Sequence, residues 1–320
     1  MDDKTKILDV LTAQDDFLLT AHINPDGDAF GSCVALGFVC KKLGKKFYLY
    51  NESGLPERFN WLSLPAPFED NLPASKPQWI IVLDSGNKER VGDKLLPWLK
   101  EVPVINIDHH ADNTCFGRLN LIRPKAASVG EIIAELACDL DVKLTPPLSE
   151  AIYLTLVTDT GSFAYGNTTS FTHNLVAKML DLGLDSSKIH ALLDKNWTKN
   201  KIQLMILALS TLETFFEDKV GLICITQKMF RQTKTNKEDC EGFINYVRGL
   251  KTTMVAISLR EELNKTVKFS LRSYGDVDVQ QIAAALGGGG HKNAAGGTIN
   301  GSIEEAKTKL LTQVKNALCL

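Results

Sequence analysis

The chain has 320 residues, of which 44% are hydrophobic and 23% are charged. This length allows two domains with buried cores, and the composition is that of a globular protein, which argues against a disordered or fibrous chain. No apolar run approaches the length of a membrane span, and the acidic, amphipathic start MDDKTKILDVLTAQDD is unlike a secretory signal. We therefore expect a cytoplasmic protein.

The net charge of −2 hides a difference between two parts of the chain. Residues 1–215 carry 21 Lys and Arg against 27 Asp and Glu, whereas residues 216–320 carry 15 against 11. An acidic part joined to a basic part suits a metal in the first and an anionic ligand in the second. It does not suit a tight, general nucleic-acid binder, which needs a strongly basic face.

The seven cysteines form no C-x-x-C pair. This spacing argues against both a disulfide framework and a thiolate zinc site. We expect reduced and mostly buried thiols at Cys33, Cys40, Cys115, Cys138, Cys224, Cys240 and Cys319.

Short apolar runs alternate with amphipathic stretches through the first half of the chain. The runs FLLTAHI, KKFYLY, WIIVLD and VPVINID predict strands, since strands of a parallel sheet with helices on both faces are continuously apolar. Apolar residues at helical spacing predict helices over 28–43, about 92–100, 128–140 and 146–157. This order predicts a doubly wound α/β domain with a mainly parallel sheet.

Polar clusters follow several of these strands, at the edge where such sheets bind ligands. The first cluster, HINPDGD, places the imidazole of His22 and the carboxylates of Asp26 and Asp28 on a sharp turn ahead of a helix. Taken alone, N-P-D-G-D is more typical of a helix-capping turn than of a metal site.

Three further clusters carry the same types of side chain. Asp84 ends WIIVLD, Asp108-His109-His110 follows VINI, and Asp159 ends an apolar helical run. Each signal is weak alone, but a pair of divalent cations needs about six protein ligands, one of them a bridging carboxylate. The sequence therefore predicts a two-cation site formed by His22, Asp26, Asp28, Asp84, His109 and Asp159.

The pattern changes after the first domain, which we place at residues 1–185. A long helical stretch with serines placed to cap it predicts a connector over 186–216. Alternation of apolar and polar residues in VGLICIT, TTMVAISLRE and TVKFSLRS then predicts half-exposed strands, and helical segments flank them. We expect a smaller α+β domain over 217–320.

This second domain offers groups that can bind a phosphate, which are the backbone of Gly288, Gly289 and Gly290 and the side chains of His291, Arg272 and Arg248. The glycines lack β-carbons, so their amides can surround a phosphate, although a glycine run alone is typical of a flexible loop. A neighbouring histidine can add a charge-assisted hydrogen bond. Arg272 is the best candidate for a second clamp and Arg248 a weaker one, because a guanidinium binds phosphate through two hydrogen bonds.

The motifs HINPDGD, VLDSG, DHH and TDTGSF, in this order, resemble those of the DHH phosphoesterase superfamily. GGGGHKNAAGG resembles the DHHA1 domain of that superfamily, so the resemblance covers essentially the whole chain. Within the superfamily the sequence is most similar to the NrnA-like enzymes, and EGFINYVRGL is similar to a segment of their second domain. This resemblance implies activity on very short oligoribonucleotides and on adenosine 3′,5′-bisphosphate (pAp), and it implies a homodimer.

The resemblance also implies roles for the predicted site residues. One ion would be held by His22, Asp26 and Asp84, the other by Asp28, His109 and Asp159, and Asp84 would bridge them. His110 would face the substrate phosphate, and Asp108 would orient the histidine pair. Four carboxylates and two imidazoles favour Mn²⁺, with Mg²⁺ as a weaker substitute.

We therefore expect a Mn²⁺-dependent phosphoesterase that hydrolyses nanoRNA, such as pApA, to 5′-mononucleotides and converts pAp to AMP. In this enzyme, a phosphate pocket in the second domain would select short substrates.

Hydrolysis of cyclic dinucleotides stays open as an alternative, because both substrates offer a phosphodiester near a second phosphate. An inorganic pyrophosphatase is less favoured, since a nucleotide-sized clamp has no purpose there. A non-catalytic nucleotide-binding regulatory module is a further alternative, although such a protein can lose metal ligands and this chain retains all of them.

Overall fold

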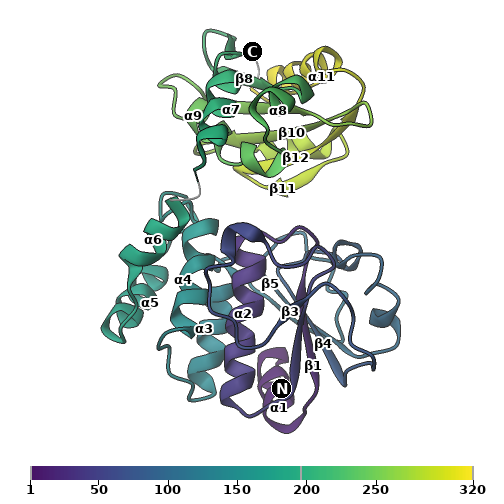
Figure 1. The fold of residues 1–320 in the computed structure, drawn as a ribbon, viewed down its shortest axis with the longest axis vertical. Coiled ribbons are helices and arrows are strands. Elements are labelled where there is room, and N and C mark those ends of the chain that lie inside the picture. The colour runs from purple at the N-terminus through teal and green to yellow at the C-terminus, as the bar shows by residue number, and fades with distance from the viewer. Residues whose placement is uncertain (1, 195–196, 319–320) are drawn as a thin grey trace. The chain divides into compact units, whose positions relative to one another are not determined.

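A computed structural model of the chain describes residues 2–194 and 197–318 (Figure 1). The chain divides into two compact units, residues 1–196 and residues 197–320. The described residues of each unit form one six-stranded sheet. Each sheet has apolar clusters on both faces, as expected for domains with separate cores.

The first sheet contains β1 (Phe17–Ala21), β2 (Phe47–Tyr50), β3 (Phe68–Glu69), β4 (Trp79–Leu83), β5 (Val104–Asp108) and β6 (Leu119–Ile122). All neighbouring strands are parallel and follow the order β3-β2-β1-β4-β5-β6. The strand order reverses between β1 and β4, which are neighbours and form the switch point of a doubly wound sheet. The predicted fold class and the four predicted strands are confirmed.

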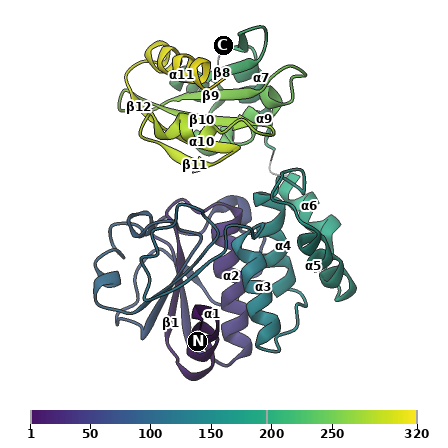
Figure 2. The ribbon, with the colours of Figure 1, turned by 180° about the vertical axis from the view of Figure 1, so that it is seen from behind.

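The helices of this unit are α1 (Asp3–Ala13), α2 (Gly27–Lys42), α3 (Val129–Asp139), α4 (Leu148–Asp159), α5 (Ser170–Asp181) and α6 (Ser186–Asp194). α2, α3 and α4 run side by side against one face of the sheet, and α5 and α6 lie beside α4 (Figures 1 and 2). The predicted helices over 28–43, 128–140 and 146–157 are confirmed with small shifts at their ends.

The other face of this sheet is covered differently from the prediction. Val91, Leu95 and Val102 pack there against strand residues such as Ile80 and Val82. They belong to a loop with two short 3₁₀ turns, η2 (Lys88–Val91) and η3 (Trp98–Lys100). The predicted helix over 92–100 is wrong, because Gly92 has a φ of 98° and Pro97 lacks the amide hydrogen that a helix interior needs.

The second sheet contains β7 (Glu213–Phe215), β8 (Val220–Ile225), β9 (Val255–Glu261), β10 (Thr266–Ser273), β11 (Gly289–His291) and β12 (Ala294–Asn300). Its order is β11-β12-β10-β9-β8-β7. Among the described strand pairs of this second sheet, only β8–β9 is parallel, and the others are antiparallel. The three predicted strands are confirmed as β8, β9 and β10. β8 is buried on both faces and does not show the expected alternation, because helices cover both sides of it.

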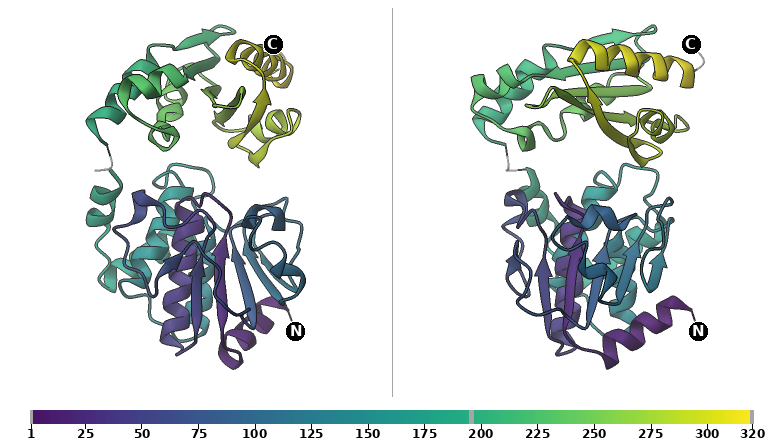
Figure 3. Two further views of the ribbon diagram at one scale, coloured as in Figure 1. Left: turned by 45° about the vertical axis from the view of Figure 1, so that its right-hand side comes forward. Right: turned by 90° about the vertical axis from the view of Figure 1, so that its right-hand side faces the viewer.

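The helices of the second unit are α7 (Lys199–Leu209), α8 (Gln227–Thr233), α9 (Phe243–Arg248), α10 (Val279–Ala284) and α11 (Ile303–Ala317), with the 3₁₀ turn η4 (Lys237–Cys240). α7, α8 and α9 pack on one face of the sheet, and α10 and α11 pack on the other. Figure 3 shows α11 lying along this second face.

The expected connector over 186–216 is not one helix. α6 ends at Asp194 and belongs to the first unit, whereas α7 belongs to the second, and residues 195 and 196 lie outside the described part. The expected serine caps are not the ones used. Thr198 caps α7 by accepting a hydrogen bond from the Lys201 amide, and Asp185 caps α6 by accepting a hydrogen bond from the Lys188 amide. The end of the stretch forms β7, because its backbone pairs with β8.

The cysteines in the described residues are free thiols, and Cys319 lies outside them. Cys33 and Cys40 are buried, but Cys115 and Cys138 are exposed, so the expectation of mostly buried thiols holds only in part. Among the described helices, none combines the length and the apolar character that crossing a bilayer requires.

Two glycines allow α2 and α4 to approach closely. A β-carbon on Gly27 would collide with the side chain of Thr158, and one on Gly31 would lie 2.7 Å from the Thr155 methyl group and 2.9 Å from the Ala151 carbonyl oxygen. The last of these atoms belongs to the backbone and cannot rotate away. The close approach matters because α2 begins, and α4 ends, at predicted site residues.

We therefore expect Gly31→Val to lower the free energy of unfolding by about 2–3 kcal/mol, as overpacking of a buried contact does. Urea denaturation of the metal-free protein measures this change. Gly166→Val is the matched control, because a β-carbon at Gly166 meets no atom within 4 Å, and its effect should stay within about 0.5 kcal/mol. Equal stability of the two variants would show that the helices are not held at this distance.

Candidate metal centre

The predicted metal ligands of the first unit come together at the carboxyl ends of three neighbouring strands. His22 follows β1, Asp84 follows β4, and His109 follows β5. These strands are parallel and adjacent, so their ends share one edge of the sheet. Asp28 in the first turn of α2 and Asp159 at the end of α4 complete the cluster from the helical layer.

Three carboxylates surround the Nε2 atom of His109. This atom lies 3.6 Å from Oδ2 of Asp28, 3.7 Å from Oδ1 of Asp84 and 3.6 Å from Oδ2 of Asp159. His109, Asp28 and Asp84 are almost fully buried, and Asp159 is partly exposed. The set matches the second of the two predicted ion sites, with Asp84 added.

The other predicted site lies on the opposite side of Asp84. Nε2 of His22 is 3.7 Å from Oδ2 of Asp84 and 4.0 Å from Oδ2 of Asp26. Asp84 therefore directs one carboxylate oxygen to His22 and the other to His109. Its φ of 53° is uncommon for a residue other than glycine, and such backbone conformations concentrate at functional sites.

Hydrogen bonds at Nδ1 hold both predicted ligand histidines, His22 and His109, in the neutral tautomer that a metal requires. Nδ1 of His22 lies 2.8 Å from the carbonyl oxygen of Ile23, and Nδ1 of His109 lies 3.1 Å from that of Ala126. A carbonyl oxygen can only accept, so each Nδ1 carries the proton and donates it. In the neutral form of each ring, the lone pair of Nε2 then faces the carboxylates.

Burial and mutual repulsion shift the pKa values of the carboxylates in the metal-free chain. Burial, together with the charges of Asp84 and Asp159, raises the pKa of Asp28 well above its usual range. Burial and the charge of Asp84 raise the pKa of Asp159 to about 7, although His109 opposes the shift. Burial lowers the pKa of His109, but the surrounding carboxylates outweigh burial and raise it to about 10.

The geometry fits divalent cations. The Nε2-to-oxygen distances of 3.6 to 4.0 Å are too long for hydrogen bonds. Ligand atoms that bind one ion at about 2.0–2.2 Å lie roughly 3–4 Å apart, which is this spacing. Oδ1 of Asp84 is buried and has no hydrogen-bond partner among the described residues, as expected of an atom placed to bind a cation.

Backbone and side-chain donors that the sequence did not reveal hold the ligands in place. The amides of Val129 and Gly130, at the start of α3, donate to Asp28 at 2.8 and 3.3 Å. Nδ2 of Asn167 lies 3.2 Å from the carbonyl oxygen and 3.5 Å from Oδ2 of Asp159. The contacts of Asp28 join residues 101 and 102 positions apart, and Asn167, eight residues beyond Asp159, belongs to none of the site motifs, so the sequence does not indicate either set.

The predicted catalytic pair also lies at this edge. Nδ1 of His110 donates to Oδ1 of Asp108 at 2.8 Å, and Asp108 is fully buried. Burial raises the pKa of Asp108, but hydrogen bonds from His110 and Asn113 outweigh burial and lower it to about 2. The carboxylate is therefore ionised and orients the His110 ring.

Two of the predicted substrate residues of the second unit, Arg272 and His291, lie on one face of its sheet. Ala294 pairs with Arg272 on one side and with His291 on the other, so these three residues form a row across β10, β12 and β11. Arg272 also pairs with Ala256, whose side chain packs with residues of α9. Arg248 ends α9, and its guanidinium lies 4.5 Å from the ring centre of Tyr274.

The glycine-rich segment is part of a hairpin and is not the open loop of amides that we expect. Gly289 and Gly290 lie in β11, and the Gly288 amide donates to the Ala283 carbonyl, which occupies this donor. A β-carbon on Gly288 would collide with the backbone of Gly296, so this glycine allows two backbones to pack. Only Gly289, of these three glycines, has open space at its β-carbon position, and it lies on the face that carries His291.

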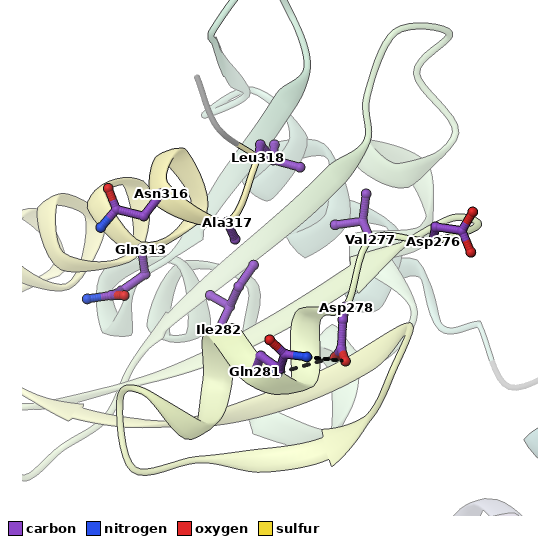
Figure 4. Close-up of a pocket in the computed structure, with 9 residues that line it drawn as sticks. All are labelled: Asp276, Val277, Asp278, Gln281, Ile282, Gln313, Asn316, Ala317 and Leu318. Carbon is purple, nitrogen blue, oxygen red and sulfur yellow. Dashed lines mark hydrogen bonds between the residues drawn. The ribbon is translucent and has the colours of Figure 1, made fainter.

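A separate cavity of about 610 Å³ lies between α10 and the end of α11 (Figure 4). It contains none of the predicted substrate residues. Both carboxylate oxygens of Asp278, which faces it, already accept hydrogen bonds from α10, and Asp276 pairs with Lys292. Because these charged groups already have partners, nothing in the cavity indicates a ligand.

Comparison with known families defines the class of protein. Residues 16–158 match the model of the DHH family, N-terminal domain, and residues 221–318 match that of the DHHA1 domain. These two matches fall in the first and second units, respectively. The candidate metal ligands other than Asp159 lie within the DHH match, Asp159 directly follows it, and the glycine-rich hairpin lies in the DHHA1 match.

Whole-chain comparisons place the protein within this class. It is 32% identical to the bifunctional oligoribonuclease and PAP phosphatase NrnA of Thermus thermophilus, over 94% of this chain and 89% of the relative. It is 26% identical to the Bacillus subtilis protein of that name, over 92% of this chain and 93% of the relative. A crystal structure of an exopolyphosphatase-related protein from Bacteroides fragilis matches with a TM-score of 0.88 and 25% identity, over 98% of this chain and 96% of that one. The chain therefore belongs to the DHH phosphoesterase superfamily, in the family of the NrnA proteins.

Metal binding to the metal-free protein should release protons. At pH 7 His109 carries a proton that it must lose to bind a cation, and Asp159 is about half protonated. Affinity for Mn²⁺ should therefore rise from pH 6 to pH 8, by about tenfold per pH unit for each proton released. Calorimetric titrations in two buffers with different ionisation enthalpies measure this release.

The exposed His173 provides a control, since His173→Gln should leave the proton release unchanged. An affinity for Mn²⁺ that does not vary over this pH range would contradict the assignment of His109 and Asp159 as ligands.

Proposed function

We propose that the chain is a divalent-metal-dependent phosphoesterase that hydrolyses short oligoribonucleotides to 5′-mononucleotides and converts pAp to AMP. The shared carboxylate of Asp84, with one oxygen toward His22 and one toward His109, is the observation that carries the proposal. The names of the NrnA relatives support the choice of substrates.

In this proposal, His22, Asp26 and Asp84 hold one ion and Asp28, His109 and Asp159 hold the other. Mn²⁺ is the proposed metal, because the donors combine imidazole nitrogen with carboxylate oxygen. When bound, two such ions would activate water and stabilise negative charge on a phosphoryl group. The proposal includes a homodimer, which only the resemblance to the family supports.

The residues of the chain itself bind and orient the substrate. Asp108 holds Nδ1 of His110, so any contact of this imidazole with a phosphate goes through Nε2. In the second unit, Arg272 and His291 on one face of the sheet are the proposed ligands of a substrate phosphate. Gly289 leaves room beside them, Gly288 and Gly290 allow the hairpin to form, and Arg248 approaches the same face through α9.

With Mn²⁺, the purified protein should convert pApA to AMP and release phosphate from pAp, and a chelator should abolish both reactions. Asp84→Asn keeps the shape of the side chain but removes the charge that two ions would share, so we expect kcat to fall about 100-fold or more. Mass spectrometry of the products from RNAs of two to five residues, pAp, cyclic dinucleotides and pyrophosphate measures the specificity.

Asp93→Asn is the matched control for this variant, because Asp93 is exposed and lies outside the cluster. It should retain full activity. An unmodified protein that binds Mn²⁺ and pApA without turnover would favour a regulatory module, and faster turnover of cyclic dinucleotides than of pApA would favour the alternative substrate.

Arg272→Lys should raise KM for pApA about tenfold and change kcat by less than about threefold, because an ammonium group cannot form the paired hydrogen bonds of a guanidinium. Steady-state kinetics with pApA measures both constants. Arg231→Lys, at an exposed position of the same unit, should leave them unchanged. An unaltered KM in Arg272→Lys would remove Arg272 from the proposed phosphate site.

A further inference from the structure

The segment that follows His109 and His110 folds back toward the end of β5. The amide of Thr114 donates to the carbonyl oxygen of Gly86 at 2.8 Å, which ties this segment to the turn that carries Asp84. The preceding residue, Asn113, is thereby brought beneath the end of β5, where Asp108 and His110 lie. No motif in the sequence marks Asn113, and the proposed function gives it no role.

The orientation of the Asn113 amide follows from its partners. Its Oδ1 lies 2.7 Å from the backbone nitrogen of Cys115, which can only donate, so this atom must be the oxygen. Nδ2 therefore points the other way. It lies 2.5 Å from Oδ2 of Asp108 and 2.8 Å from Oδ1 of Asn106, and it donates to both.

A second buried amide holds this arrangement. Nδ2 of Asn106, which is fully buried, lies 3.3 Å from the carbonyl oxygens of both Val82 and Ser85. These oxygens can only accept, so Oδ1 of Asn106 is the atom that faces Asn113. The two amides thus fix each other and connect the backbone after β4 to the carboxylate at the end of β5.

Asp108 is consequently held by both of its oxygens. Oδ2 accepts from Asn113, and Oδ1 accepts from Nδ1 of His110. Without the Asn113 donor, the buried carboxylate could turn about its χ2 bond, and its hold on the imidazole would loosen. Charge-assisted hydrogen bonds of this kind are short and directional, which suits them to aiming a ring.

We propose that Asn113 is a positioning residue of the phosphoesterase reaction, which acts through Asp108 to fix the tautomer and the direction of the His110 imidazole. This role rests on the proposed function of the same site. It concerns the group that faces the substrate phosphate and not the retention of metal. Removing Asn113 should therefore lower kcat more than it alters KM or metal content.

The test uses the full chain with Mn²⁺ and pApA as substrate. Asn113→Ala and Asn113→Leu should each lower kcat about tenfold, with KM within about twofold of the unmodified value and the Mn²⁺ content unchanged. Leu has the branched shape of Asn and a somewhat larger volume but no donor, so a similar loss in both variants separates the hydrogen bond from packing. Asn120→Ala is the control, because among the described residues the Asn120 side chain hydrogen-bonds only to Gly117, and this variant should leave kcat unchanged.

A spectroscopic readout distinguishes positioning from a purely structural role. In the Mg²⁺-loaded protein, at a pH above the pKa of the ring, ¹⁵N NMR of His110 should show a proton on Nδ1 alone in the unmodified chain and a mixture of tautomers in Asn113→Ala. An unchanged kcat, an unchanged tautomer or a loss of bound metal in Asn113→Ala would overturn the role while the proposed function stands. An unmodified protein that does not hydrolyse pApA would overturn the proposed function, and this role with it.

Discussion

The structure of the first unit depends on one electrostatic constraint, which is that three carboxylates are held within 4 Å of a single imidazole nitrogen. Without cations, these groups repel one another in a buried place, and their raised pKa values express that cost. The three carboxylates therefore do not come together because they attract one another. The surrounding fold must impose it.

The fold does so by taking each ligand from a different element. Asp84 and His109 are fixed by neighbouring strands of the sheet, whereas Asp28 and Asp159 are carried by α2 and α4. The glycines of α2 let these two helices approach, and the amides at the start of α3 compensate part of the charge of Asp28. Because the predicted ligands meet only in the folded unit, cations bound there would link metal binding to folding and would stabilise the fold by mass action.

The sequence alone was sufficient to predict those elements of this arrangement that produce periodic patterns of apolar residues. Continuous apolar runs identified β1, β2, β4 and β5, and the rule that parallel strands end at one edge placed the polar clusters together. Patterns could not identify the loop over 92–100, whose apolar residues cover the sheet at helical spacing without forming a helix. They also could not identify Asn113 or Asn167, since an asparagine whose side chain donates to a carboxylate five or eight residues away resembles one in any turn.

The glycine-rich hairpin shows the same limit in another form. From the sequence, four successive glycines indicate amides that surround a phosphate, but the structure assigns them different tasks. Gly288 and Gly290 are needed where two backbones approach, and Gly289 alone leaves space on the face that carries His291 and Arg272. Composition therefore singled out this segment, whereas strand register decides which of its residues share a face with His291 and Arg272.

The adjacent histidines show how one short motif supplies two chemical functions. Their rings stand at 82° to each other, with centres 5.3 Å apart, so they face different surroundings. Nδ1 of His109 donates to a neutral carbonyl oxygen, which directs Nε2 toward the carboxylates of the candidate site, whereas Nδ1 of His110 donates to an ionised carboxylate. Burial lowers the pKa of His110, but Asp108 and Asp84 outweigh burial and raise it. An imidazole that is more readily protonated suits contact with a phosphate, so the partner of each Nδ1 atom, and not its place in the motif, sets what each histidine can do.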